Sequence, residues 1–377
     1  MIDAFRPRRR TAVAGTAALV AFCLATPLCA SASAAPAAAA DAPAIAPEAA
    51  PAAPQHKTPA ERILGAKPRS GLPWFSGIWR GAPHTAAAVD NVGHWRGHPI
   101  DAVTSYSNKR VLHPSSGPDS LADSRWNVST FSGFGGLMSY NLAMIPSDNS
   151  VTFDSIIKGD QDEVWRLNAR ALKENGRGNA LVNIGWEANG DWYKWSATYL
   201  NAPKFRDAWN RIAMVMKQET PGLKFGFIIG CGRAMTGQLN RMDSLERLYP
   251  GNERVDVVGC NDYDWWHIKG RNEREWKKRI NPPLAAGLAD VAAFARKHQK
   301  GFAVSEWGLS ATDKHGSGDN PFYIRKMFEF FEQNKDVLVM ENYFMEAEGN
   351  VTNSLHNPAQ MPKSAEAYKE SINRIKR

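Results

Sequence analysis

The sequence predicts an α/β protein whose single large domain is a (β/α)8, or TIM, barrel. Eight short apolar runs recur along the chain, and each has the length and composition of a buried parallel strand. Longer amphipathic segments with helical periodicity lie between several of these runs. Eight strands with intervening helices in one domain of about 300 residues are typical of a closed barrel.

The expected strands are apolar runs bounded by turn-forming residues. In chain order they are Trp74–Trp79, Ala102–Tyr106, Leu137–Ile145, Leu181–Trp186, Phe225–Gly230, Val255–Cys260, Phe302–Glu306 and Val337–Tyr343. The clearest helices follow an apolar period of 3.6 residues. They are expected at Asp162–Glu174, Pro203–Glu219, Leu284–His298, Pro321–Asn334 and Ser364–Ile375. Glycine, proline and serine in the loops at 113–120 and 129–136 leave the first three units the least sharply defined.

The N-terminus has the pattern of a secretory signal peptide. Four arginines lie among residues 6–10, an apolar stretch runs from Thr11 to Leu28, and Ala32-Ser33-Ala34 matches a cleavage signal. A permanent membrane span is the alternative, but Pro27 and the small residues in the apolar stretch disfavour it. We therefore expect residues 1–34 to be removed, and the mature protein to be secreted or periplasmic without a stable membrane span.

An Ala/Pro-rich linker is expected at residues 35–60, because such a composition cannot form a packed core. The barrel domain is then residues 61–377. The formal net charge of +8 falls to +5 once residues 1–34, with four arginines and Asp3, are removed. This modest excess is spread along the chain and does not predict nucleic-acid binding.

Two cysteines, Cys231 and Cys260, remain after cleavage, and each follows an apolar strand. In an exported protein they can form a disulfide. Two buried free thiols are equally compatible with the spacing, so the sequence leaves both alternatives open.

Glu187 follows the fourth expected strand within the stretch LVNIGWEANGDWYKW, residues 181–195. In a TIM barrel the C-terminal ends of the strands carry the chemistry. An acid placed there beside tryptophan and tyrosine suits a sugar ring, because aromatic faces stack on apolar sugar surfaces. The plainer alternative is a loop carboxylate that holds a backbone amide.

Glu306 ends the seventh expected strand in the stretch FAVSEWG, residues 302–308. Taken alone, this acid is also explained as a satisfied carboxylate at a strand end. Two acids that each end an apolar strand beside a tryptophan are what hydrolysis of a glycosidic bond requires. We therefore predict Glu187 and Glu306 as a catalytic pair.

A third stretch, DVVGCNDYDWW at residues 256–266, also ends an apolar strand with polar and aromatic groups. Tyr263 is placed to hydrogen-bond a neighbouring carboxylate and keep it ionised. The chain has thirteen tryptophans, and the usual burial tendency assigns about half of them to the core. The expected substrate contacts are Tyr263, Trp192, Trp195, Trp265, Trp307, Asn189 and Tyr343.

These motifs resemble glycoside hydrolase family 26. WEANGDWYKW is similar to the family's acid/base motif, DVVGCNDYD to its sixth-strand segment and VSEWG to its nucleophile strand, in matching order over roughly residues 70–377. The resemblance implies a retaining (β/α)8 hydrolase with Glu187 as acid/base, Glu306 as nucleophile and Tyr263 as the nucleophile's hydrogen-bond partner. The family's mannanases usually place histidine directly before the acid/base, whereas this chain has Trp186, which bears on the mannan substrate more than on the hydrolase chemistry.

The sequence thus predicts an exported, retaining endo-glycoside hydrolase that cleaves β-mannan or a related β-linked polysaccharide by double displacement. Two alternatives remain open: a non-catalytic carbohydrate-binding barrel, and a hydrolase of an acidic exopolysaccharide. The chemistry requires no cofactor, and we expect a monomer. We expect no metal site either, because Gly97 and Pro99 argue against a helix that would bring His94 and His98 together.

Overall fold

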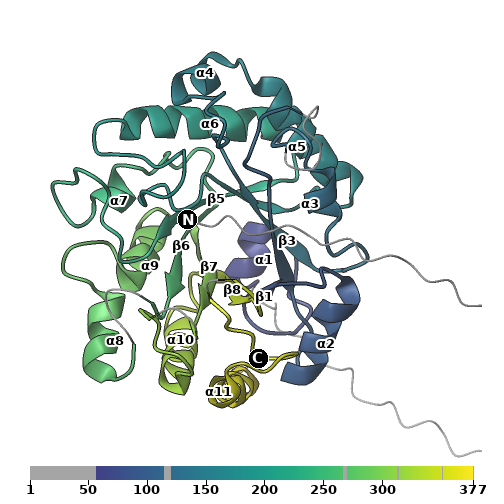
Figure 1. Cartoon of the computed structure of the whole chain (residues 1–377), viewed down its shortest axis with the longest axis vertical. Helices are drawn as coiled ribbons and strands as arrows, with labels where there is room; N and C mark the ends of the chain where they lie inside the picture. Colours follow the sequence, from purple (N-terminus) through teal and green to yellow (C-terminus); the bar gives the residue numbers. More distant parts are fainter. Residues whose placement is uncertain (1–56, 114–119, 266–269, 312–313, 350, 377) are drawn as a thin grey trace, which may run out of the picture. The chain divides into compact units, whose positions relative to one another are not determined.

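The computed structural model describes residues 57–113, 120–265, 270–311, 314–349 and 351–376. The predicted signal peptide and residues 35–56 of the predicted linker lie outside this part of the chain. Eight parallel strands form a closed barrel in the order of the sequence, with helices around it (Figure 1), which confirms the predicted fold class. The strands are β1 (Phe75–Arg80), β2 (Ala102–Tyr106), β3 (Leu137–Leu142), β4 (Leu181–Ile184), β5 (Lys224–Gly230), β6 (Val257–Tyr263), β7 (Gly301–Gly308) and β8 (Leu338–Met345).

The five predicted helices are present with small boundary changes. They are α5 (Asp162–Glu174), α6 (Ala202–Glu219), α9 (Leu288–Lys297), α10 (Pro321–Gln333) and α11 (Pro362–Arg374). The prediction placed the start of α9 four residues too early, because residues 284–287 form a turn and the Gly287 N–H bonds the Asp290 carboxylate at 2.9 Å to cap the helix. The helices not predicted are α1 (Pro59–Leu64), α2 (Ala86–Arg96), α3 (Arg125–Ser129), α4 (Phe153–Lys158), α7 (Asp243–Glu246) and α8 (Glu273–Ile280).

Helix α2 corrects the argument made from Gly97. The glycine does not prevent a helix; it ends one, with φ of 83° in the left-handed region that favours glycine. His94 is therefore helical, whereas His98 lies beyond the cap. Among the described residues, none of the α-helices is long and apolar enough to cross a membrane.

Short helix α1 packs against the N-terminal end of the barrel. Its Ala60 and Leu64 join a buried cluster with the first residues of several strands, including Phe75, Leu181 and Val257. The rest of the core lies between the strands and the outer helices. Because apolar side chains fill the N-terminal end, the polar strand residues gather at the opposite end, where this fold places its chemistry.

Glu341 is a buried carboxyl on β8. Its Oε2 accepts a hydrogen bond from Trp307 Nε1 at 2.6 Å, and no described group hydrogen-bonds its Oε1. Burial raises the pKa of Glu341 to about 8. The folded protein therefore binds a proton that the unfolded chain releases between roughly pH 4.3 and 8, and stability contributed by this group is lost as pH rises through that window.

Glutamine at position 341 cannot ionise and removes this loss. We expect Glu341→Gln to raise the free energy of unfolding relative to wild type by about 3 to 4 kcal/mol more at pH 8 than at pH 5. Urea denaturation at both pH values measures the difference. Glu332→Gln, at an exposed position on α10, provides the control for replacing a glutamate by glutamine elsewhere in the chain. If the free energy of unfolding of Glu341→Gln differs from that of wild type by the same amount at both pH values, this carboxyl does not titrate between them.

Candidate active site

Glu187 lies in the loop that follows β4, three residues beyond the end of the strand. The strand ends earlier than predicted because Gly185 and Glu187 have φ of 56° and 54°, in the left-handed region. For a non-glycine residue this conformation costs roughly 1 to 3 kcal/mol and is concentrated at functional sites. The Glu187 N–H donates to Ile228 O at 2.8 Å, which fixes the loop against β5.

The carboxyl of Glu187 accepts two side-chain hydrogen bonds. Asn261 Nδ2 on β6 donates to Oε1 at 3.0 Å, and Trp192 Nε1 donates to Oε2 at 3.1 Å. Glu187 is half-buried, so solvent reaches it. Lys109, whose Nζ lies 4.7 Å from the Tyr193 ring centroid, adds a positive charge nearby.

Glu306 lies inside β7, which extends to Gly308, and is only 7% exposed. Tyr263 OH donates to its Oε2 at 2.8 Å, and Asn141 Nδ2 donates to its Oε1 at 3.3 Å. Asn183 Nδ2 donates to Asn141 Oδ1 at 2.9 Å, which leaves the Asn141 amide nitrogen turned toward Glu306. The hydroxyl of Tyr106 is buried and makes no hydrogen bond to a described group.

Asn261 brings the two acids into one site. It is paired with Glu306 across the β6–β7 ladder, and its side chain donates to Glu187. The charge of Glu187 also acts on Glu306. Two glutamates 119 positions apart in the sequence therefore meet at the C-terminal end of the barrel.

Burial raises the pKa of both glutamates. For Glu306 the charge of Glu187 adds to this, whereas the hydrogen bond from Tyr263 acts in the opposite direction. For Glu187, Asn261, Trp192 and Lys109 partly offset the effect of burial. Each carboxyl disfavours ionisation of the other, so the two protons come off in steps that belong to the pair and not to either residue alone.

Half-buried aromatic rings surround the pair. Trp192 is 44% exposed, and Tyr263 and Trp265 are half-buried, so these three predicted contacts remain available to a substrate. Trp79 and Phe344 stack on each other with ring centroids 5.8 Å apart. Their rings contact Tyr106 and Tyr263, at 5.1 Å for Trp79–Tyr106 and 5.8 Å for Phe344–Tyr263.

The side chains of four other predicted substrate contacts are buried, and in this structure none of them faces solvent. Trp195 is 1% exposed, donates to Trp186 O at 2.9 Å and stacks on Tyr193. Trp307 is fully buried among aromatic rings, where its indole N–H bonds a carboxyl on β8. Tyr343 is fully buried and donates to the backbone at 2.9 Å.

Asn189, the fourth, is fully buried and ties the Glu187 loop to the loop after β5. Its Oδ1 accepts from Gly230 N at 2.7 Å, while its Nδ2 donates to Gly230 O at 2.8 Å and to Arg233 O at 2.9 Å. Trp195 and Asn189 thus support the loop that carries Glu187 without facing a substrate.

Sequence reasoning missed four side chains of the site: Asn261, Asn141, Tyr106 and Trp79. Each ends or nearly ends a strand, which is the signal that could have found them. Asn261 even stands inside the quoted stretch NDYD, two residues before Tyr263. Its contact with Glu187 spans two barrel strands, and no local pattern encodes such a contact.

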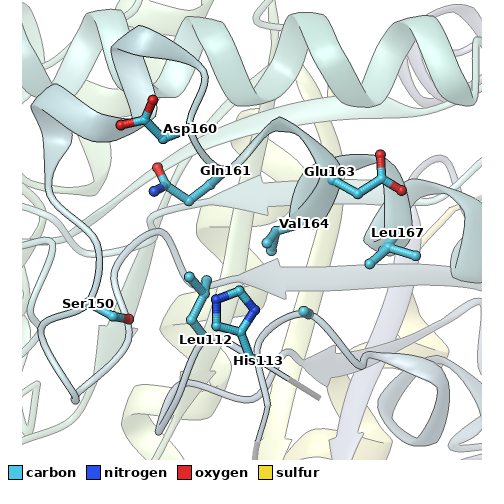
Figure 2. Close-up of a pocket in the computed structure, with 9 residues that line it drawn as sticks. Leu112, His113, Ser150, Asp160, Gln161, Glu163, Val164 and Leu167 are labelled. Atoms are coloured by element: carbon cyan, nitrogen blue, oxygen red, sulfur yellow. The ribbon is translucent and has the colours of Figure 1, made fainter. Parts of the chain in front are cut away.

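A separate pocket of about 380 Å³ lies between the loop after β2 and the start of α5 (Figure 2). Leu112, Val164 and Leu167 supply apolar lining, and Asp160 and Glu163 supply carboxylates. None of the residues around the two glutamates lines it. In the part of the chain that the structure describes, no group of three or more His, Cys, Asp or Glu side chains is placed to hold a metal ion.

No family model matches the sequence, and the search of curated proteins found no match. Solved structures do match. The chain is 15% identical to the catalytic domain of a Bacillus sp. JAMB-750 GH26 endo-β-1,4-mannanase, with a TM-score of 0.58 over 84% of this chain and 89% of that one.

Two further structures are similar to this chain at the same level. GH26C from a Muricauda species is 14% identical, with a TM-score of 0.60 over 84% of this chain and 88% of that chain. A modular endo-β-1,4-mannanase from Cellulomonas fimi is 15% identical, with a TM-score of 0.59 over 84% and 74%. The chain therefore has the (β/α)8 fold of the family 26 mannanases.

Proposed function

We propose that this protein is a retaining endo-glycoside hydrolase that acts on a β-linked polysaccharide. The observation that carries the proposal is the pair of half-buried Glu187 and buried Glu306, held together through Asn261 at the C-terminal end of the barrel. Two facing carboxyl groups are the machinery of glycosidic-bond hydrolysis. The aromatic rings around them suit the apolar faces of sugar rings.

In the proposed mechanism Glu187 carries the proton that the pair holds and gives it to the departing glycosidic oxygen. Ionised Glu306 attacks the anomeric carbon and forms a covalent glycosyl-enzyme. Glu187, now ionised, takes a proton from water as that water attacks the same carbon, which frees Glu306 with retained configuration. No cofactor enters these steps.

The hydrogen bonds support this division of roles. Glu306 accepts hydrogen bonds from Tyr263 and Asn141, and such donors stabilise a carboxylate. Glu187 has two side-chain donors and a half-buried position on a loop, where it can reach both a leaving group and water. Each carboxyl accepts two side-chain hydrogen bonds, so position supports the assignment: Glu306, fixed within β7, as nucleophile and Glu187, on the loop, as acid/base.

β-Mannan is the first substrate to test, because similar solved structures are described as endo-β-1,4-mannanases. Trp186 supports extending the proposal to related β-glycans. Its Nε1 donates to Tyr193 OH at 3.0 Å, so this side chain cannot offer a substrate the polar group that histidine would offer. The Cys231–Cys260 disulfide suits an oxidising compartment and supports export.

The test is incubation of the mature protein with β-mannan, mixed-linkage glucan, xylan and an anionic exopolysaccharide. We expect oligosaccharides from at least one of them, with the product's anomeric configuration retained when it is followed by NMR. Binding without products on the whole panel would favour a carbohydrate-binding barrel. Inverted products would contradict the double displacement.

A further inference from the structure

The disulfide between Cys231 and Cys260 lies next to the residues that hold Glu187. Cys231 directly follows β5, and Cys260 lies within β6 immediately before Asn261. The structure thus decides between the two alternatives that the cysteine spacing left open. The disulfide also lies beside the active site, so its effect on the residues that hold Glu187 can be considered separately from its effect on stability.

On the β6 side, the disulfide adjoins Asn261, whose side chain donates to Glu187 and whose backbone is paired with Glu306 in the ladder. The strand register shifts between Cys260 and Asn261, so the regular ladder to β7 does not fix Asn261 by itself. Cys231 N donates to Asn261 O at 2.9 Å, which holds Asn261 from the β5 side. The disulfide anchors the residues at both ends of that hydrogen bond.

On the β5 side, the bond adjoins the contacts of the Glu187 loop. Gly230, which precedes Cys231, exchanges hydrogen bonds with Asn189. Arg233, two residues after Cys231, accepts from Asn189 through its carbonyl and places its guanidinium 5.3 Å from the ring centroid of Trp192. Both side-chain donors to Glu187, Asn261 and Trp192, are therefore positioned by residues within two positions of the disulfide.

We propose that the Cys231–Cys260 disulfide is a positioning bond for the acid/base carboxyl, and that its loss slows turnover in a protein that remains folded. The inference rests on the proposed function, since it assigns Glu187 its role there. A catalytic group displaced by about 1 Å from its productive position lowers the reaction rate about 100-fold. Removing one crosslink that supports the donors is expected to cost about tenfold.

The experiment compares the oxidised wild type with the double variant Cys231→Ser/Cys260→Ala, well below the melting temperature of each. We expect kcat to fall about tenfold with KM within about twofold. The basic limb of the pH profile should move to higher pH, because hydrogen bonds from Asn261 and Trp192 lower the pKa of Glu187 and both are loosened. Lys109 and Glu306, the other charged groups that act on the site, are unchanged in this variant.

The oxidised variant Asn261→Ala keeps the disulfide and tests the same path. It should reproduce the shift in the pH profile, and removing the disulfide in its background should have little further effect on kcat. If the double cysteine variant does not fold, wild-type protein whose disulfide is reduced under native conditions is compared with the oxidised protein instead, with the same expected fall in kcat.

Direct titration separates this inference from the proposed function. The pKa of Glu187 followed by NMR with carbon-13 glutamate is expected to be higher in the double cysteine variant, whether or not a substrate is known. An unchanged pKa and an unchanged kcat with a lower melting temperature would overturn the positioning role and leave a purely structural bond. Failure of the wild type to cleave any polysaccharide would instead overturn the proposed function.

Discussion

Glu306→Gln is expected to lower kcat on the polysaccharide about 10⁴-fold or more, with KM changed only a few-fold. An amide has the shape of the carboxyl but cannot attack the anomeric carbon, so the covalent step is lost while the binding surface stays. Tyr263 and Asn141 each donate a hydrogen bond to one oxygen of the Glu306 carboxyl. The glutamine amide keeps one oxygen and can therefore still accept one of these two hydrogen bonds. Initial rates over a range of polysaccharide concentrations measure both constants.

Glu341→Gln is the matched control. Glu341 is also a buried glutamate at a barrel strand, but its carboxyl bonds Trp307, away from the acid pair, and the substitution is expected to leave kcat unchanged. Retention of substantial activity by Glu306→Gln would remove Glu306 as the nucleophile. Equal losses in the two variants would point to a folding defect.

The fold and the acid pair were predictable because they depend on local patterns. Apolar runs and helical periodicity place eight strands, and an acid that ends an apolar run is visible in the sequence. The strand boundaries shifted where the backbone departs from regular geometry, as at Gly185 and Glu187, whose left-handed conformations end β4 early. A glutamate in the sequence gives no signal that its backbone will adopt a left-handed conformation.

The exposure of individual rings could not be predicted, because it depends on packing between distant elements. Trp192 and Trp195 stand three residues apart in one loop, yet one is 44% exposed and the other 1%. Trp195 is covered because it packs on Trp186 and Tyr193, and Trp307 because helices α10 and α11 bring Tyr323 and Tyr368 against it. Asn261 was missed for the same reason, since its role depends on contacts with Glu187 after β4 and Glu306 on β7.

Glu187→Gln is expected to have an effect that depends on the leaving group. On the polysaccharide, kcat should fall about 10²- to 10⁴-fold, because the glycosidic oxygen leaves poorly without a proton. On an aryl glycoside of the same sugar, whose phenolate leaves without help, formation of the glycosyl-enzyme should be nearly as fast as in the wild type. A burst of phenol release followed by slow turnover, measured by stopped flow, reports this difference.

The pH profile of Glu187→Gln gives a second, independent outcome. In the wild type, activity is lost as pH rises through the upper apparent pKa of the pair, because Glu187 then loses its proton. The variant has no such proton, so the basic limb should disappear. Glu187 is already protonated at the pH where Glu306 gains its proton, so the neutral glutamine should leave the acid limb close to its wild-type position. A variant that keeps the wild-type basic limb would show that another group supplies the proton, and the assignment of Glu187 as acid/base would then be wrong.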